Sequence, residues 1–372
     1  MNMKIFALIG CLGLLFFPLA CSKVYTLQPL SNSSTPTLTP TSTATIPICN
    51  GGMVTTLAGS GSAGNTNATG TAASFSGPYG ICADSAGNVY VGDNGNDMIR
   101  KITPGGVVST LAGGSQGAVN GIGTAASFSG PDGVAVDTAG NVYVADTGNC
   151  MIRKITPAGL VSTLAGAGSP GYINATGTAA AFYAPYGVAV DTSGNVYVAD
   201  TYNLVIRKIT PGGVVTTLAG SGFQGSVNAT GTAASFNYPF DVAVDASGNV
   251  YVADTFNYLI REITPGGLVT TLAGTGGKGA NNGPAATATF FDPRGVAVDS
   301  SDDVYVSDNG NNMVRVIVPG AGVFTLAGQL TAGAVNATGT AASFDLPEQI
   351  AVDPFCNVYV TDWENQLIRK IH

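Results

Sequence analysis

Short apolar stretches alternate with turns rich in Gly, Asn and Asp along nearly the whole chain after residue 50. A typical unit contains the apolar stretches GVAVD, NVYVAD, IRKI and GLVSTLAG, separated by the turn sequences TAGN, TGN and TPA. Stretches rich in β-branched and aromatic residues between turn signals are typical of β-strands. Each unit is therefore predicted to fold into four antiparallel strands.

This four-strand pattern occurs six times, at a spacing of 53 or 54 residues, with the second-strand tyrosine at Tyr90, Tyr143, Tyr197, Tyr251, Tyr305 and Tyr359. Self-similarity at a fixed period indicates a repeat architecture. The last unit ends after its third strand, at 367–371, whereas an unmatched fourth strand, 52–57, precedes the first unit. A stacked array would leave one unit short, but a ring would join the two loose strands and remove an exposed edge. We expect an all-β, six-bladed β-propeller of four-stranded blades, closed by the N-terminal strand completing the last blade.

The residues that recur in every unit are predicted to stabilise the fold and not to form a functional site. An Asp at the first turn position and a Gly at the fourth suit a type I turn, as in the turn after Asp137. Asp146 and Asn149 can bond turn backbone, and Arg153 can pair with Asp146. The recurrent GTAASF segment is expected to bury its phenylalanine between blades, at Phe75, Phe128, Phe182, Phe236 and Phe344.

The sequence GNVYVADTGNxxIRKI resembles the NHL repeat, and region 51–372 is similar to bacterial NHL-repeat propellers. The resemblance implies a six-bladed propeller. It implies little about activity, because such rings serve as protein-binding platforms, RNA binders, sensor domains and, in relatives, lyases or lactonases.

The N-terminus has the anatomy of an export signal. Lys4 precedes an apolar stretch, 5–20, that ends in Pro18-Leu19-Ala20-Cys21, which resembles a bacterial lipoprotein cleavage box. We therefore expect a signal peptide at 1–20, lipidation at Cys21, a Ser/Thr/Pro-rich tether at 21–50, and the propeller at 51–372. The expected location is the bacterial cell envelope, lipid-anchored at the outer membrane or cell surface. An ordinary secretory peptide is the alternative. An uncleaved membrane span is less favoured, because this stretch falls short of the ~20 apolar residues required.

Composition excludes several functions. The formal net charge is -8 and no basic patch is visible, which argues against nucleic acid binding. His372 is the single histidine, so neither a zinc lyase with several His ligands nor a Ser-His-Asp triad is expected. A calcium-dependent lactonase or hydrolase survives as an alternative, with oxygen ligands from Asp132, Asp241 and Glu348. The first strands are expected to offer no carboxylate in mid-channel. We therefore predict no catalytic residues, no metal site and no cofactor, with calcium as the one possible exception.

Cysteines provide two further expectations. Cys82 replaces a strand valine and is predicted to be a buried thiol. Cys49 and Cys356 fall in turns of the same blade, and a disulfide between them would lock the ring in an exported protein. Two free thiols are the alternative, because turns separated by an intervening strand can exceed disulfide reach.

We expect a specific function to depend on positions at which the residue differs from one unit to the next. The long loops, the middle residue of P-x-G and the central pair of D-x-x-N are all predicted to lie on one face of the ring. This face should carry aromatics with a few charges near its centre, which suits a protein, peptide or glycan ligand. The predicted binding residues are Tyr79, Asp132, Tyr186, Tyr202, Phe240, Phe256, Arg294, Glu348 and Trp363. Arg294 and Glu348 fall on adjacent blades, so a salt bridge between them is the alternative. We expect a monomeric binding module without catalysis; a purely architectural envelope protein is the remaining possibility.

Overall fold

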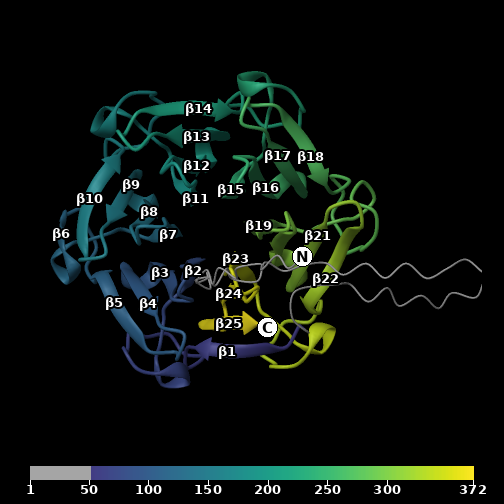
Figure 1. Cartoon of the computed structure of the whole chain (residues 1–372), viewed down its shortest axis with the longest axis horizontal. Coiled ribbons are helices and arrows are strands. Elements are labelled where there is room, and N and C mark those ends of the chain that lie inside the picture. The colour runs from purple at the N-terminus through teal and green to yellow at the C-terminus, as the bar shows by residue number, and fades with distance from the viewer. Residues whose placement is uncertain (1–51) are drawn as a thin grey trace, which may run out of the picture. The chain divides into compact units, whose positions relative to one another are not determined.

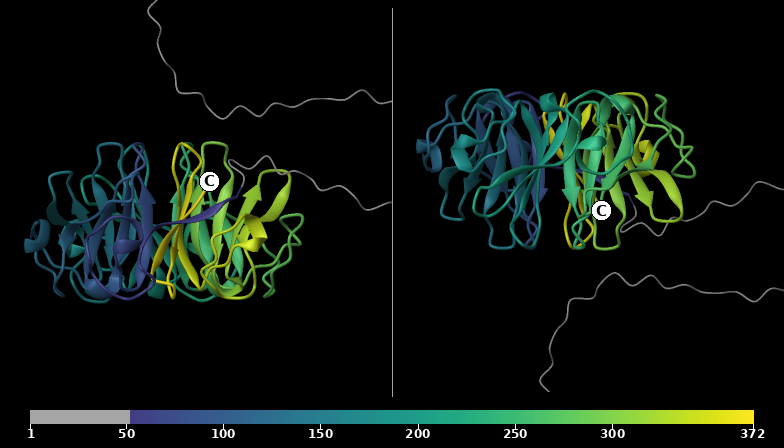
Figure 2. Two further views of the ribbon diagram at one scale, coloured as in Figure 1. Left: turned by 90° about the horizontal axis from the view of Figure 1, so that it is seen from below. Right: turned by 90° about the horizontal axis from the view of Figure 1, so that it is seen from above.

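The computed structural model describes residues 52–372, which form six antiparallel sheets arranged around a central axis (Figure 1). The six innermost strands are β2 (Pro78–Ala83), β7 (Pro131–Val136), β11 (Pro185–Val190), β15 (Pro239–Val244), β19 (Pro293–Val298) and β23 (Pro347–Val352). Edge-on, the ring is a flat disc whose strands run between its two faces (Figure 2). The prediction of an all-β, six-bladed propeller with four-stranded blades is confirmed.

The remaining strands follow outward in the order of the sequence. The second strands are β3 (Val89–Asp93), β8 (Val142–Asp146), β12 (Val196–Asp200), β16 (Val250–Asp254), β20 (Val304–Asp308) and β24 (Val358–Asp362). The third strands are β4 (Met98–Ile102), β9 (Met151–Ile155), β13 (Val205–Ile209), β17 (Leu259–Ile263), β21 (Met313–Val318) and β25 (Leu367–Ile371). The outer strands are β5 (Val108–Gly113), β10 (Leu160–Ala165), β14 (Val215–Ala219), β18 (Val269–Ala273), β22 (Gly322–Gly328) and β1 (Val54–Ala58), and β6 (Gly121–Ile122) adds to β10.

Helical structure in residues 52–372 is limited to single 3₁₀ turns of two recurrent kinds. The GTA segments form η1 (Gly70–Ala72), η3 (Gly123–Ala125), η5 (Gly177–Ala179), η7 (Gly231–Ala233) and η10 (Gly339–Ala341). The D-x-x-N segments form η2 (Asn94–Asn96), η4 (Thr147–Asn149), η6 (Thr201–Asn203), η8 (Thr255–Asn257) and η9 (Asn309–Asn311). Within this part of the chain, no helix is long and apolar enough to cross a membrane.

The sixth blade combines strands from both ends of the described chain. Its sheet has the order β1-β25-β24-β23, with Val54 opposite Ile371 and Thr55 opposite Lys370 (Figure 1). The inner strands β2 and β23 also contact each other, which brings the first and last blades together around the axis. The first described strand therefore occupies the position that the unpaired strands in the sequence predicted for it.

The apolar core lies between neighbouring blades. One cluster, for example, joins Tyr197 and Ile206 of the third blade to Phe236, Val242 and Val250 of the fourth. The phenylalanines of the GTAASF segments are fully buried, as predicted, and Phe290 takes the same place in the fifth unit, whose sequence departs from that motif. Because every blade shares its apolar core with a neighbour, we expect the blades to depend on one another for stability.

In each blade the repeated Asp and Arg residues form a buried ion pair, and the repeated Asn donates a hydrogen bond to its carboxylate. In the third blade, Arg207 Nη1 lies 2.6 Å from Asp200 Oδ2, and Asn203 Nδ2 donates to the same carboxylate. These repeat ion pairs are fully buried and join Asp93–Arg100, Asp146–Arg153, Asp200–Arg207, Asp254–Arg261, Asp308–Arg315 and Asp362–Arg369. The prediction that these residues stabilise the blades is confirmed.

Candidate functional site

The two faces of the ring carry different kinds of connection. The D-x-x-N turns and the starts of the inner strands lie together on one face, here called the loop face. The short turns between first and second strands, such as Asp191–Gly194, lie on the opposite face, here called the turn face. In that turn Gly194 N donates to Asp191 O and Gly194 has φ +79, as a type I turn with a final left-handed glycine requires.

A charged group of side chains lies at the axis on the loop face. Arg294 Nη1 donates to Glu348 Oε1 at 2.9 Å and to the hydroxyl of Tyr79 at 3.1 Å. The Glu348 side chain is 2% exposed and that of Arg294 is 26% exposed. These residues come from the fifth, sixth and first blades. The salt bridge considered from the sequence is therefore present, and its arginine remains partly open to solvent.

Asp132 of the second blade completes this group, which we call the axial cluster: Tyr79, Asp132, Arg294 and Glu348. Asn94 Nδ2 donates to Asp132 Oδ1 at 2.6 Å, and Asp132 is buried. Burial raises the pKa of Asp132 to about 7, against the opposing effect of hydrogen bonds from Thr147 and Asn94. Burial likewise raises the pKa of Glu348, and the Arg294 charge opposes that shift. Both carboxyl groups are thus already held by neighbours within the protein.

Aromatic side chains of the third and fourth blades form a continuous patch beside the axial cluster. The ring centroids of Tyr183 and Tyr202 lie 5.1 Å apart, those of Tyr202 and Tyr238 5.4 Å, and those of Tyr238 and Phe256 5.2 Å. The inner rings Tyr186 and Phe240 lie 4.8 Å apart. They connect to this row, since the Tyr186 and Tyr202 centroids lie 6.5 Å apart and those of Phe240 and Phe256 6.3 Å. We define the aromatic patch as Tyr183, Tyr186, Tyr202, Tyr238, Phe240 and Phe256.

Three rings of the aromatic patch are strongly exposed: Tyr183 at 42%, Tyr202 at 45% and Phe256 at 43%. The patch joins the axial cluster at two points. The Arg294 guanidinium lies 4.8 Å from the Phe240 ring centroid, and the Tyr79 and Tyr186 rings lie 6.0 Å apart. The loop face therefore carries exposed apolar rings next to a partly exposed cation, a combination that suits an amphipathic ligand.

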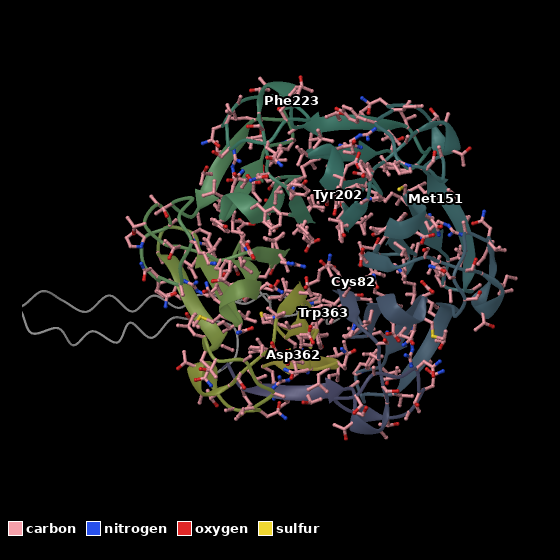
Figure 3. The ribbon with its side chains drawn as sticks, turned by 180° about the vertical axis from the view of Figure 1, so that it is seen from behind. Cys82, Met151, Tyr202, Phe223, Asp362 and Trp363 are labelled. Carbon is pink, nitrogen blue, oxygen red and sulfur yellow. The ribbon has the colours of Figure 1, made fainter. Side chains whose placement is uncertain are left out.

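The structure brings together most of the residues predicted for binding, but Trp363 lies apart. It belongs to the sixth blade, across the axis from Tyr202 in the third blade (Figure 3). Its indole nitrogen faces Gly77 of the first blade, and the side chain is half-buried. Trp363 therefore covers the junction of the first and last blades and is not part of the aromatic patch.

The central channel contains a carboxylate that the sequence interpretation did not expect in mid-channel. A cavity of about 210 Å³ is lined by valines and alanines of all six inner strands, together with Asp241 and Gln349. Asp241 Oδ2 accepts from Val296 N at 3.1 Å, and Gln349 Nε2 lies 3.4 Å from Oδ1. Burial raises the pKa of Asp241 to about 8. Asp241 had been considered as an oxygen ligand of the channel, and it does line the channel, whereas the expectation that the first strands offer no carboxylate there was wrong. Asp241 replaces a P-x-G glycine, and its side chain reaches over Gly187, where a Cβ would collide with it.

The cysteine predictions have mixed outcomes. Cys82 is half-buried and lines the central cavity, and burial raises the pKa of its thiol well above the ordinary value. Cys356 replaces the left-handed turn glycine, with φ +63 and its N–H bonded to Asp353 O. Cys49 and the lipidation residue Cys21 lie outside the described residues, as do the signal peptide and tether. The disulfide and the lipid anchor stay predictions.

Tyr183 and Tyr238 were not among the binding residues predicted from the sequence. Each precedes the inner-strand proline by one or two residues, in YAPY and NYPF, and this placement is the signal that could have assigned them to the patch. Within residues 52–372, no group of three or more His, Cys, Asp or Glu side chains is arranged to hold a metal ion. Calcium binding stays untested.

Comparison with known proteins agrees with the fold. The NHL-repeat family profile matches residues 128–155, 182–208 and 290–317. SUPPRESSOR OF QUENCHING 1 of Arabidopsis thaliana is 27% identical over 66% of this chain and 25% of its own length. NHL repeat-containing protein 2 of Bos taurus is 27% identical over 64% of this chain and 46% of its own length. The chain thus spans less than half the length of these curated relatives.

Solved structures show the same architecture at low sequence identity. A Bacteroides thetaiotaomicron protein of unknown function is 20% identical, with a TM-score of 0.67 over 86% of this chain and 75% of its own. An auxiliary nutrient binding protein of the same organism is 17% identical, with a TM-score of 0.62 over 86% and 76%. A gluconolactonase of Xanthomonas campestris is 13% identical, with a TM-score of 0.55 over 86% and 88%. The chain contains NHL repeats on a six-bladed propeller.

Proposed function

We propose that this protein is an exported, membrane-anchored binding module whose loop face binds a protein, peptide or glycan through the aromatic patch. The observation that carries the proposal is the exposure of Tyr183, Tyr202 and Phe256 in one row of touching rings. Contiguous exposed apolar surface is uncommon on a soluble monomer unless it binds something. Tyrosines suit such a surface because each offers a large apolar ring and a hydroxyl at low entropic cost.

Two further observations support this proposal. The described chain enters the ring at the turn face, because Met53 N donates to the C-terminal His372 O at the end of β25. The first described residues therefore lie on the face opposite the aromatic patch. Among proteins with the same fold, two Bacteroides structures are described as auxiliary nutrient binding proteins. A ligand-binding role at the envelope is in keeping with both.

The test is a binding screen of the chain against oligosaccharides and peptides, followed by substitutions in the ring. Tyr202→Ala and Phe256→Ala are expected to weaken binding by about tenfold or more each. Phe223→Ala is the matched control, because Phe223 is 77% exposed but lies at the outer rim, away from the patch (Figure 3). Equal losses in all three variants, or binding that survives both patch substitutions, would contradict the proposal.

An oxygen-ligated hydrolase at the channel mouth is the alternative. It has less support, because Glu348 and Asp132 already accept hydrogen bonds from Arg294 and Asn94. Calcium that raises the melting temperature, with loss of that response in Asp132→Asn or Glu348→Gln, would favour the hydrolase over the binding module.

A further inference from the structure

A second niche recurs around the ring, close to the turn face. In four blades a lysine ammonium lies over the second-strand tyrosine ring, with Nζ–centroid distances of 5.4, 5.3, 5.2 and 5.8 Å for Lys101–Tyr90, Lys154–Tyr143, Lys208–Tyr197 and Lys370–Tyr359. In the same niche the tyrosine hydroxyl donates to the first turn aspartate, as Tyr197 does to Asp191 at 3.1 Å. Each of these niches thus combines an aromatic ring, a carboxylate and the protein's own ammonium group.

The fourth blade keeps the acceptors of this niche but lacks the ammonium. Tyr251 donates to Asp245 Oδ2 at 3.1 Å, and Asn249 Nδ2 donates to the same oxygen at 2.8 Å. Opposite Tyr251 on β17, where the four other blades have lysine, this blade has Glu262. The fifth blade has Val316 there, and its Tyr305 is fully buried in an apolar cluster. Within residues 52–372, charge reversal at this position occurs in the fourth blade alone.

Glu262, the residue at which the charge is reversed, lines a cavity. About 290 Å³ of space is lined by Asp245, Tyr251 and Glu262, by Asp302 from the fifth blade, by the polar residues Ser247 and Asn249, and by the apolar residues Leu272, Val304, Ile317 and Pro319. The equivalent cavity between the third and fourth blades is lined by Asp191, Tyr197, Lys208 and Asp245. Its charged side chains are two carboxylates and one ammonium, whereas the cavity at Glu262 has three carboxylates and no cation. Asp302 adds the third, at the turn position where the fourth blade has Gly248.

Three like charges around one cavity are unfavourable without a cation. Burial raises the pKa of Glu262, and the charges of Asp245 and Asp302 raise it further. An ammonium ion bound among them would relieve this repulsion. The apolar wall of the cavity matches the methylene stem that carries an ammonium group in lysine or an alkylamine.

We propose that the cavity at Glu262 binds a primary ammonium group from outside the chain, in the place that the protein's own lysine occupies in four other blades. The ammonium can belong to a lysine side chain of a partner or to a free alkylamine, because both have the same head group and an apolar stem. The site is separate from the aromatic patch, so it does not depend on the function proposed for the loop face.

The test measures binding of n-butylamine to the chain at pH 7 by saturation-transfer NMR, with 1-butanol as the uncharged control. We expect saturable binding of the amine alone, at one site. Glu262→Lys should abolish it, because this variant restores the lysine that four other blades accommodate; unchanged melting would show that the fold is intact. Glu262→Gln should weaken binding by about tenfold. N-acetyl-lysine amide that binds as well as n-butylamine would identify lysine side chains as ligands; failure of this compound alone would restrict the site to free amines.

A second variant makes the test independent of any loss of folding. Lys208→Glu gives the equivalent cavity three carboxylates, from Asp191, Asp245 and the new side chain, so we expect a second amine site and a stoichiometry of two. Equal binding of n-butylamine to the Glu262→Lys variant would overturn the proposal. It would also be overturned if calcium, and not the amine, bound in a manner that Glu262→Lys abolishes, because the cavity would then be a metal site.

Discussion

The molecule uses carboxylate–arginine pairs in two regions, and they differ in burial and in repetition. The repeat ion pair Asp200–Arg207 is 0% exposed and occurs in the same form in all six blades. The axial pair Arg294–Glu348 occurs once, joins two different blades, and leaves its arginine 26% exposed. Sixfold repetition therefore marks side chains that hold the blade together. A pair that occurs once, open to solvent beside exposed rings, lies where the repeated scaffold does not determine the sequence.

The contacts of the two arginines explain the difference. Arg207 bonds Asp200, the carbonyl oxygens of Ala181 and Ile173, and Asn174 Oδ1, so one guanidinium ties a long loop to two strands. Arg294 bonds side chains only, Glu348 and Tyr79. The backbone contacts of Arg207 tie it into the blade scaffold, whereas Arg294 organises a surface.

Removal of a repeat arginine is expected to have the largest effect. Arg207→Met would leave Asp200 buried without its cation and the loop carbonyls without donors. Breaking a buried pair in this way costs about 3–5 kcal/mol, so the urea midpoint should fall sharply or the chain should fail to fold. Lys208→Met, at the next position on the same strand, is the control and should cost much less. A midpoint for Arg207→Met close to that of the control would show that the repeat pairs are not scaffold.

Removal of the axial arginine is expected to cost less. Arg294→Met leaves Glu348 buried, but this carboxyl can take up a proton, and the site is next to solvent. We expect a loss of about 1–3 kcal/mol in the free energy of unfolding. The double variant Arg294→Met with Glu348→Gln should recover much of it, because no buried charge remains. A double variant less stable than the single one would contradict this account.

The sequence predicted the repeated features well because each arises from local chemistry copied six times. Asp at a turn start, Asn three residues after the strand-ending Asp, and Phe in GTAASF have the same neighbours in every blade. The fifth unit lacks the GTAASF motif but still buries Phe290. The place of this phenylalanine in the blade, and not the surrounding motif, therefore determines its burial.

Features that depend on the distance between blades could not be predicted in the same way. Trp363 was grouped with Tyr202 because both occupy D-x-x-N loops, yet a six-membered ring places their blades on opposite sides of the axis. Asp241 enters the channel because its neighbour across the blade interface is Gly187, which no periodic pattern reveals. The aromatic patch likewise depends on contacts between the third and fourth blades.

Asp241 allows a pH test of the axial region, because its pKa lies above the value of about 6 to which burial raises the pKa of the repeat-pair aspartates Asp200, Asp254, Asp308 and Asp362. Its pKa is about 8 in the folded protein, against an ordinary value of 3.8. Well below pH 3.8 the group is protonated in both states, so its contribution to stability is complete there. That contribution is lost as the pH rises through about 8, because the unfolded state releases its proton first.

Asp241→Asn removes this dependence. The variant should become more stable relative to the natural chain as the pH rises from 5 to 8.5, by about 1 kcal/mol or more in the free energy of urea unfolding. Asp245→Asn, a turn aspartate nearby in sequence, serves as the comparison for loss of one charge. A constant difference between the natural chain and Asp241→Asn over this range would mean that Asp241 is ionised in the folded channel.

The smallest effect on stability is expected where the loop face is most exposed. Tyr202→Ala removes a ring that is 45% exposed and packs against the Tyr183, Tyr186 and Tyr238 rings of the patch. We expect a change within about 0.5 kcal/mol in thermal or urea unfolding, as for surface substitutions generally. Phe182→Ala, a fully buried ring in the same blade, should instead cost about 3–5 kcal/mol. If Tyr202→Ala destabilised the ring as much as Phe182→Ala, the patch would be part of the blade core, and its exposure would no longer argue for a ligand.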